Sequence, residues 1–136
     1  MRSILIGEFW RHRNHRESEW TLDDALRLGA FRFGAAADVL KEHGLSCDAS
    51  LNIQRPSLVW NPDEAATFAK KVLTLDWSLA IVVGVRPMLA FGVHRFRPFV
   101  PVHRSSKELI MVPYPSGQWD DVTKAAARSL AERLKS

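Results

Sequence analysis

The chain contains a single cysteine, Cys47, and this scarcity excludes whole classes of site. One cysteine cannot form an intrachain disulfide, and it cannot supply the several thiolates of a structural zinc centre. The 136 residues suffice for one domain with a hydrophobic core that needs neither kind of crosslink. We therefore expect a single domain over residues 1–136, in a reducing compartment, with no metal and no other cofactor.

Long apolar runs are also missing. No window approaches the ~18 apolar residues of a membrane-spanning helix. The N-terminal apolar stretch has about four residues before Gly7 and is too short for the core of a secretory signal. These absences predict a soluble cytoplasmic protein without membrane contact.

Several short catalytic motifs are absent as well. The chain has no glycine-rich phosphate loop ending in Lys-Ser/Thr, no G-x-G-x-x-G, no H-E-x-x-H and no G-x-S-x-G. The pattern of metal-dependent nucleases, an Asp followed by Glu-x-Lys across a hairpin, is missing too, because the central apolar stretch of the chain contains no acidic residue. The sequence therefore gives little support to nucleotide-cofactor or two-metal chemistry.

Acidic residues are absent from the 31 residues between Trp77 and Lys107. The bases of this interval are Arg86, Arg95, Arg97, Arg104 and Lys107, and two histidines, His94 and His103, lie among them. A local excess of one sign focuses the field that a polyanion feels. Over the whole chain 19 Lys and Arg face 15 Asp and Glu, a formal charge of +4. Of these 19 bases 13 are arginine, whose planar fork suits phosphate.

Apolar patterns predict an α+β domain with a mainly antiparallel sheet of about five strands and three helices. Strands are expected at residues 3–6, 51–60, 79–85, 89–97 and 108–112. Helices are expected at residues 21–44, 61–76 and from about 119 onward, and a polar loop at about 11–19. Gly29 and Gly34 leave open a break of the first helix into two.

The central strand and its successor carry the fold prediction. Residues 79–85 are apolar on both faces, as in a central strand covered on both sides. Arg86-Pro87-Met88 then predicts a tight connection to a second strand, residues 89–97, so that the two form a hairpin. Alternation within that strand puts Arg95 and Arg97 on one face, about 7 Å apart, a spacing similar to that of successive phosphates.

This basic hairpin favours a small, non-catalytic nucleic-acid-binding domain, for RNA or DNA, as the function. The predicted phosphate contacts are Arg86, Arg95, Arg97, Arg104 and Lys107, and a secondary basic patch comprises Arg11, Arg13 and Arg16. Nearby aromatic rings, Phe91, Phe96 and Phe99, would stack on bases if exposed.

Two alternatives stay open. A metal-independent ribonuclease would use the pair His94 and His103 as general acid and base, with either one as the base, and Arg95 or Arg104 as a phosphate clamp. A protein-interaction or homo-oligomeric subunit would dock a partner through an edge strand near Pro56 or through exposed tryptophan, of which the chain has 5.

Two further features have weaker functional readings. The H-x-x-H pair of His12 and His15 has metal-ligand spacing, but its basic surroundings favour a plain basic loop. Cys47 is a candidate nucleophile, yet a lone cysteine is more often a small buried residue.

Overall fold

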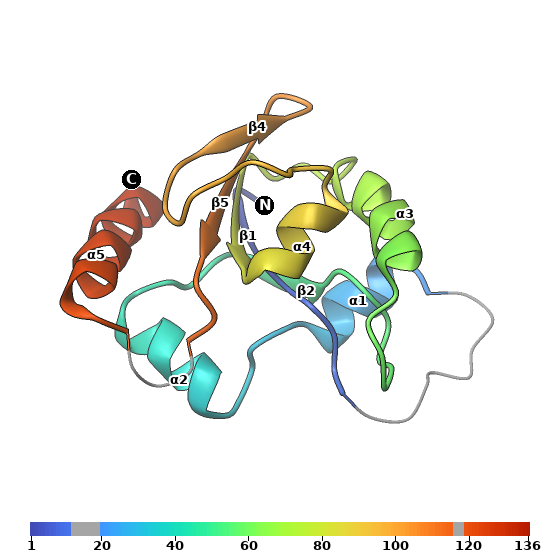
Figure 1. Ribbon diagram of the computed structural model, residues 1–136, viewed down its shortest axis with the longest axis horizontal. Coiled ribbons are helices and arrows are strands. Elements are labelled where there is room, and N and C mark those ends of the chain that lie inside the picture. Colours follow the sequence, from blue (N-terminus) through green and yellow to red (C-terminus); the bar gives the residue numbers. More distant parts are fainter. Residues whose placement is uncertain (12–19, 116–118) are drawn as a thin grey trace.

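The fold is built on one mixed sheet, seen in a computed structural model that describes residues 1–11, 20–115 and 119–136. Within those ranges five strands lie in the order β2-β1-β3-β5-β4 (Figure 1). The strands are β1 (Ser3–Gly7), β2 (Ala49–Asn52), β3 (Leu79–Val83), β4 (Val102–Arg104) and β5 (Lys107–Val112). The helices are α1 (Leu22–Leu28), α2 (Ala35–Glu42), α3 (Pro62–Val72), α4 (Val85–Ala90) and α5 (Asp121–Lys135).

The strands pair mostly in parallel, so the prediction of a mainly antiparallel sheet is wrong. β1 pairs in parallel with β2 and with β3, and β3 pairs in parallel with β5. Among the described strands only β4 and β5 run antiparallel. Parallel neighbours need crossover connections, and the helices between β1 and β5 supply them. The five helices of the described ranges also exceed the three expected.

The predicted hairpin is absent because residues 85–90 form helix α4 instead of continuing into a second strand. Gly84 has a φ of 92°, which turns the chain out of β3 and into the helix. Pro87, Met88 and Ala90 form the buried side of this short helix, whereas Leu89, the first residue of the predicted strand, is 41% exposed. Arg95 and Arg97 consequently lie in the connection from α4 to β4 and not on a strand face.

The first predicted helix is divided into α1 and α2, the alternative that its glycines had left open. Gly29 and Gly34 have φ angles of 70° and 97°, which lie outside the helical region and separate the two helices. Thr21 caps α1 in a reciprocal capping box with Asp24.

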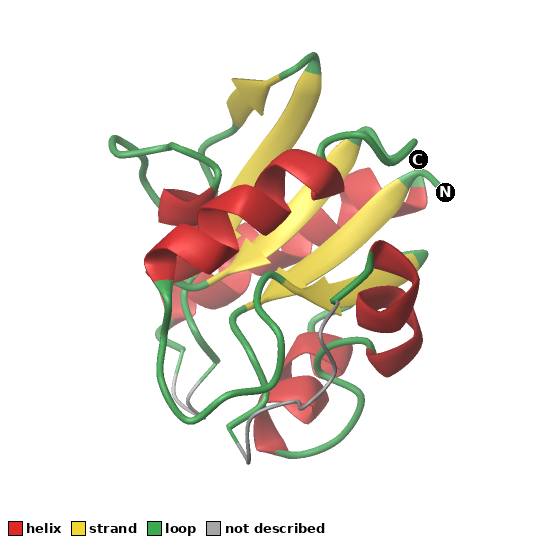
Figure 2. Ribbon diagram, turned by 90° about the vertical axis from the view of Figure 1, so that its right-hand side faces the viewer, coloured by secondary structure: helices red, strands yellow, loops and turns green. Residues whose placement is uncertain are grey.

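Helices cover both faces of the sheet (Figure 2). Helices α1, α3 and α4 pack on one face, against residues such as Ile6, Val82 and Met111. Helices α2 and α5 pack on the other, against residues such as Leu5 and Ile81. None of the helices in the described ranges has the length and apolar character needed to cross a bilayer.

The strand order places a reversal between β1 and β3. From β1 the chain moves outward to β2, and from β2 it crosses back over β1 to β3. In parallel sheets of this kind the connections on either side of the reversal diverge and leave a crevice at the carboxyl ends of the strands. The carboxyl ends of β3 and β5 lie at the lower side in Figure 1.

Candidate binding cavity at the carboxyl ends of the strands

A cavity of about 1000 Å³ lies at this crevice. Its walls come from the segments that follow β1, β2, β3 and β5 and from the connection between α1 and α2. They include Glu8, Phe9, Trp10, Arg11, Phe31, Phe33, Gly34, Ala35, Ala36, Asn52, Gly84, Val85 and Tyr114. Its position and size are those of a small-ligand site in a parallel sheet. We call it the carboxyl-end cavity.

Asn52, the last residue of β2, supplies the buried polar group of this cavity. The residue is only 6% exposed. Within the described residues its carboxamide makes no hydrogen bond to the protein. Because Asn52 lines the cavity, the donor and acceptor of its carboxamide are available to a ligand that enters it.

Gly7 allows Asn52 and Phe31 to approach the end of β1. A Cβ atom at residue 7 would lie 2.5 Å from Oδ1 of Asn52 and 2.8 Å from the ring of Phe31. Phe31 itself has a φ of 53°, an unusual angle for a residue with a side chain. Phe31 also lines the cavity, so its ring is part of the wall beside Asn52.

Aromatic rings line much of the remaining wall. The Phe31 and Tyr114 rings lie 6.2 Å apart between centroids, and the Trp10 and Phe33 rings stack at 5.3 Å. Trp10 Nε1 donates to the carbonyl oxygen of Gly29 at 3.2 Å, which fixes the indole. Phe33 and Tyr114 are 73% and 55% exposed, although ring carbons gain free energy by burial. The cavity therefore offers flat apolar faces beside one carboxamide.

Charged groups complete the site. The carboxylate of Glu8 lines the cavity directly after β1, and Arg86 Nη1 lies 3.7 Å from its Oε2 atom. Arg86 also lies over the Trp60 ring at 5.8 Å, and Arg11 over the Phe9 ring at 5.2 Å. Arg86 is thus committed to a protein carboxylate and a ring, whereas the Arg11 guanidinium is a cation on the cavity wall.

The structure places four of the residues predicted to bind phosphate in the connection after α4 and in the β4–β5 hairpin, where Arg104 and Lys107 are paired across the ladder. Arg95 and Arg97 are exposed in the connection after α4. Arg104, in β4, donates to the carbonyl oxygens of His103 and Gly92. Lys107 donates through Nζ to the carbonyl oxygens of Leu75 and Trp77, which makes its ammonium part of the packing around α3.

The two histidines of the ribonuclease alternative are both exposed and occupy different segments. His94 lies in the connection after α4. His103 lies in β4 and faces Glu108 of β5 in the ladder, and Glu108 accepts two hydrogen bonds from Arg133, of 2.6 and 3.0 Å. Neither histidine lines the carboxyl-end cavity.

Of the secondary basic patch, only Arg11 belongs to the described residues. Arg13 and Arg16 lie outside them, and so do the histidine pair His12 and His15 and most of the predicted loop at 11–19. Within the described ranges no three His, Cys, Asp or Glu side chains are grouped as metal ligands.

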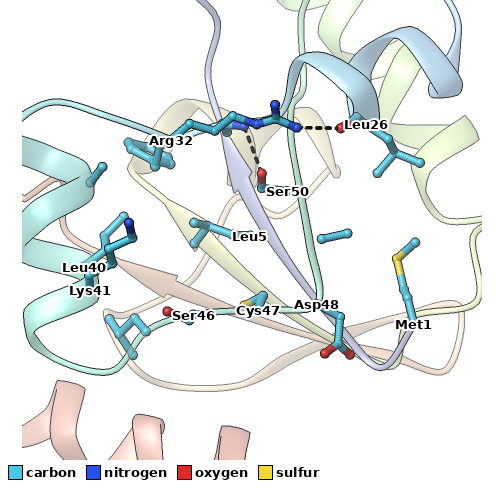
Figure 3. Close-up of a pocket in the computed structure, with 15 residues that line it drawn as sticks. Met1, Leu5, Leu26, Arg32, Leu40, Lys41, Ser46, Cys47, Asp48 and Ser50 are labelled. Carbon is cyan, nitrogen blue, oxygen red and sulfur yellow. Dashed lines mark hydrogen bonds between the residues drawn. The ribbon is translucent and has the colours of Figure 1, made fainter.

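Cys47 belongs to a second cavity of about 520 Å³ beside β2. Figure 3 shows Cys47 between Ser46 and Asp48, with Arg32 at the upper rim. Burial raises the pKa of the Cys47 thiol to about 11. At neutral pH the thiol is therefore protonated, and it lacks the thiolate character that a nucleophile needs.

Sequence reasoning missed Glu8, Phe31, Asn52 and Tyr114 as site residues. Glu8, Asn52 and Tyr114 come at or just after the end of an apolar strand, and that position was the available signal. In a parallel sheet such positions meet at one edge, whereas in the antiparallel sheet that was expected they would be divided between two. Scans against protein-family models, curated proteins and solved structures found no match to this chain.

Proposed function

We propose that this protein binds nucleic acid by taking an unpaired base into the carboxyl-end cavity. The observation that carries this proposal is Asn52, a residue only 6% exposed whose carboxamide has no protein hydrogen bond among the described residues. A carboxamide presents a donor and an acceptor side by side, and the edges of nucleobases present the complementary pair. A base held in this way has left its stack, as happens in proteins that read or modify single bases.

The aromatic wall supports the same ligand. Unstacked bases are recognised by stacking on aromatic side chains, which contributes about 1–3 kcal/mol per base. Two ring pairs, Phe31 with Tyr114 and Trp10 with Phe33, provide such surfaces in the cavity that Asn52 also lines. A purely aliphatic ligand would use the rings but would leave the carboxamide unpaired.

Cationic side chains support a polyanionic ligand over a free base. Arg11 lies on the cavity wall, and the whole chain carries a formal charge of +4. Arg95 and Arg97 are exposed and remain predicted phosphate contacts, now from a loop. Electrostatic attraction to the backbone would bring the strand to the surface, and the cavity would then select a base.

The test compares a labelled single-stranded oligonucleotide with the same strand carrying abasic sites. We expect the base-bearing strand to bind about tenfold more tightly or better, given the energy of one stacked base. The Asn52→Leu variant, similar in volume, should reduce that affinity to the abasic value and leave abasic binding unchanged. Ser129→Ala, exposed on α5, is the matched control. Equal affinities of the wild type for both strands would refute the proposal.

Glu8 favours a second, catalytic function at the same cavity: hydrolysis of the bond between the bound base and its sugar. In that reaction water attacks the sugar carbon and gives a proton to the Glu8 carboxylate, while the base departs with the electrons of the broken bond. The specific observation is a carboxylate on the wall of a cavity suited to a base. Glu8→Gln should retain binding and lose base release, measured by chromatography of the reaction products. Strand cleavage on a gel would instead favour the ribonuclease alternative.

A further inference from the structure

The amino end of helix α2 opens into the carboxyl-end cavity. Gly34, Ala35 and Ala36 line the cavity, and α2 spans eight residues, Ala35–Glu42. The first backbone bond of the helix runs from the Asp38 N–H to the Gly34 carbonyl oxygen at 3.0 Å. The N–H groups of residues 35–37 therefore precede the helical ladder and have no partner within it.

Nothing in the first turn of α2 blocks these N–H groups. Gly34 occupies the N-cap position but has no side chain that could accept from these N–H groups, and three alanines follow it. Gly34 has a φ of 97°, and a Cβ atom at that position would meet no atom within 4 Å. Asp38, the first acid of the helix, is exposed at the fourth position, and its own N–H is already bonded. Within the described residues, neither a side-chain cap nor an acid of the first three helical positions competes with a ligand for these N–H groups.

A second observation indicates a ligand at this place. Asn52 is a residue more than nine-tenths buried, its side chain has no hydrogen bond among the described residues, and it lines the same cavity as the helix end. Arg11 lines it too, so a cation adds to the positive end of the helix dipole. Among the described residues that line the cavity, Glu8 is the one carboxylate, and Nη1 of its neighbour Arg86 lies 3.7 Å from its Oε2 atom. The local field favours an anion at the α2 end.

We propose that the amino end of α2 binds a phosphate group of the nucleotide whose base occupies the carboxyl-end cavity. The phosphate oxygens accept hydrogen bonds from the N–H groups of Ala35, Ala36 and Ala37, and no side chain is required. This inference rests on the proposed function, because the phosphate belongs to the same nucleotide as the base in that cavity. It predicts that a nucleoside monophosphate binds more tightly than the matching nucleoside.

The decisive substitution is Ala36→Asp, at the second position of α2. An acid in the first turn stabilises a helix but repels an anion at its end. Lost phosphate binding in this variant therefore cannot be attributed to unfolding, provided that its melting temperature is unchanged or raised. Ala36→Asn, equal in size and neutral, controls for bulk in the cavity. Val122→Asp controls for net charge, because Val122 is exposed at the equivalent second position of α5.

Two measurements separate this inference from the proposed function. The first is titration of the ¹⁵N-labelled protein with inorganic phosphate at constant ionic strength. The amide signals of residues 35–37 should shift saturably in the wild type, in Ala36→Asn and in Val122→Asp, but not in Ala36→Asp. The second is the ratio of nucleoside monophosphate to nucleoside affinity, which we expect to fall from about ten to about one in Ala36→Asp.

The outcomes are distinct. Phosphate shifts at residues 35–37 without any base-dependent affinity would uphold the anion site and refute base binding. Base-dependent affinity with an unaltered monophosphate preference in Ala36→Asp would refute the anion site alone. Shifts that persist in Ala36→Asp, or that sulfate and chloride reproduce equally, would mean an adventitious ion only and would overturn the inference.

Discussion

Gly7 and Asn52 are paired residues at the ends of the adjacent parallel strands β1 and β2, and a Cβ atom at Gly7 would lie 2.5 Å from Oδ1 of Asn52. No real Cβ atom approaches an oxygen so closely, so the position of the carboxamide depends on glycine at residue 7. The Phe31 ring would be 2.8 Å from the same Cβ atom. The absence of a side chain at residue 7 therefore leaves room for both the Asn52 carboxamide and the Phe31 ring.

Gly7→Ala should consequently damage the cavity and the stability together. The added methyl group must displace the Asn52 carboxamide, the Phe31 ring or the backbone, and overpacking of this kind costs about 1–3 kcal/mol. We expect a lower unfolding free energy in urea and a loss of the difference between base-bearing and abasic strands. A variant with wild-type stability and wild-type base preference would show that the close contact at Gly7 does not control the site.

Lys107→Met should lower stability and leave nucleic-acid binding intact. The Lys107 ammonium donates to the carbonyl oxygens of Leu75 and Trp77 and lies 4.8 Å from the centre of the Trp77 ring. Removing it leaves those carbonyls unsatisfied, which costs about 1–3 kcal/mol. The comparison is urea unfolding of Lys107→Met against Lys70→Met, exposed on α3. A steep loss of affinity without loss of stability would instead assign Lys107 the phosphate contact predicted from its sequence position.

Local signals in the sequence located several elements correctly. Asn61 and Pro62 predict the start of α3, and the Asn61 side chain indeed accepts from the Glu64 N–H at 3.1 Å. The apolar run from Leu79 predicts a strand buried on both faces, and β3 is buried at all of its positions. Caps and buried runs depend on neighbouring residues, so one sequence is enough to find them.

Strand direction and the α4 segment depend on distant contacts, and there the sequence reasoning failed. Six residues are too few for helical periodicity to be told from alternation, so residues 85–90 were assigned to a connection and a strand. That error predicted a hairpin and, with it, an antiparallel sheet. The site was missed for the same reason. Glu8, Asn52 and Tyr114 lie at one edge of the sheet only when their strands are parallel.

Asp48 should make stability sensitive to acid. Its Oδ2 atom accepts from the backbone N–H groups of Arg2 at 2.7 Å and Ser3 at 3.1 Å, and these bonds hold the pKa of the carboxyl below its ordinary value. A lowered folded-state pKa contributes stability above the ordinary pKa, which is about 4, and loses it as the pH falls further. Asp48→Asn should therefore lower the unfolding free energy at pH 7. The difference from wild type should shrink below about pH 4 in urea titrations. A difference that is constant from pH 7 to pH 2 would contradict this account.

Arg95 and Arg97 provide the test of backbone attraction. Both side chains are exposed in the connection between α4 and β4, so the double variant Arg95→Gln/Arg97→Gln should fold normally. Each phosphate contact to a single strand contributes about 0.7 to the slope of log affinity against log salt, so losing two should reduce that slope by about 1.4. Affinity should fall equally for base-bearing and abasic strands, because phosphate contacts do not read bases. Arg128→Gln, exposed on α5, is the matched control. An unchanged slope in the double variant would remove this loop from the interface and leave Arg11 and the α2 end as the groups that meet the backbone.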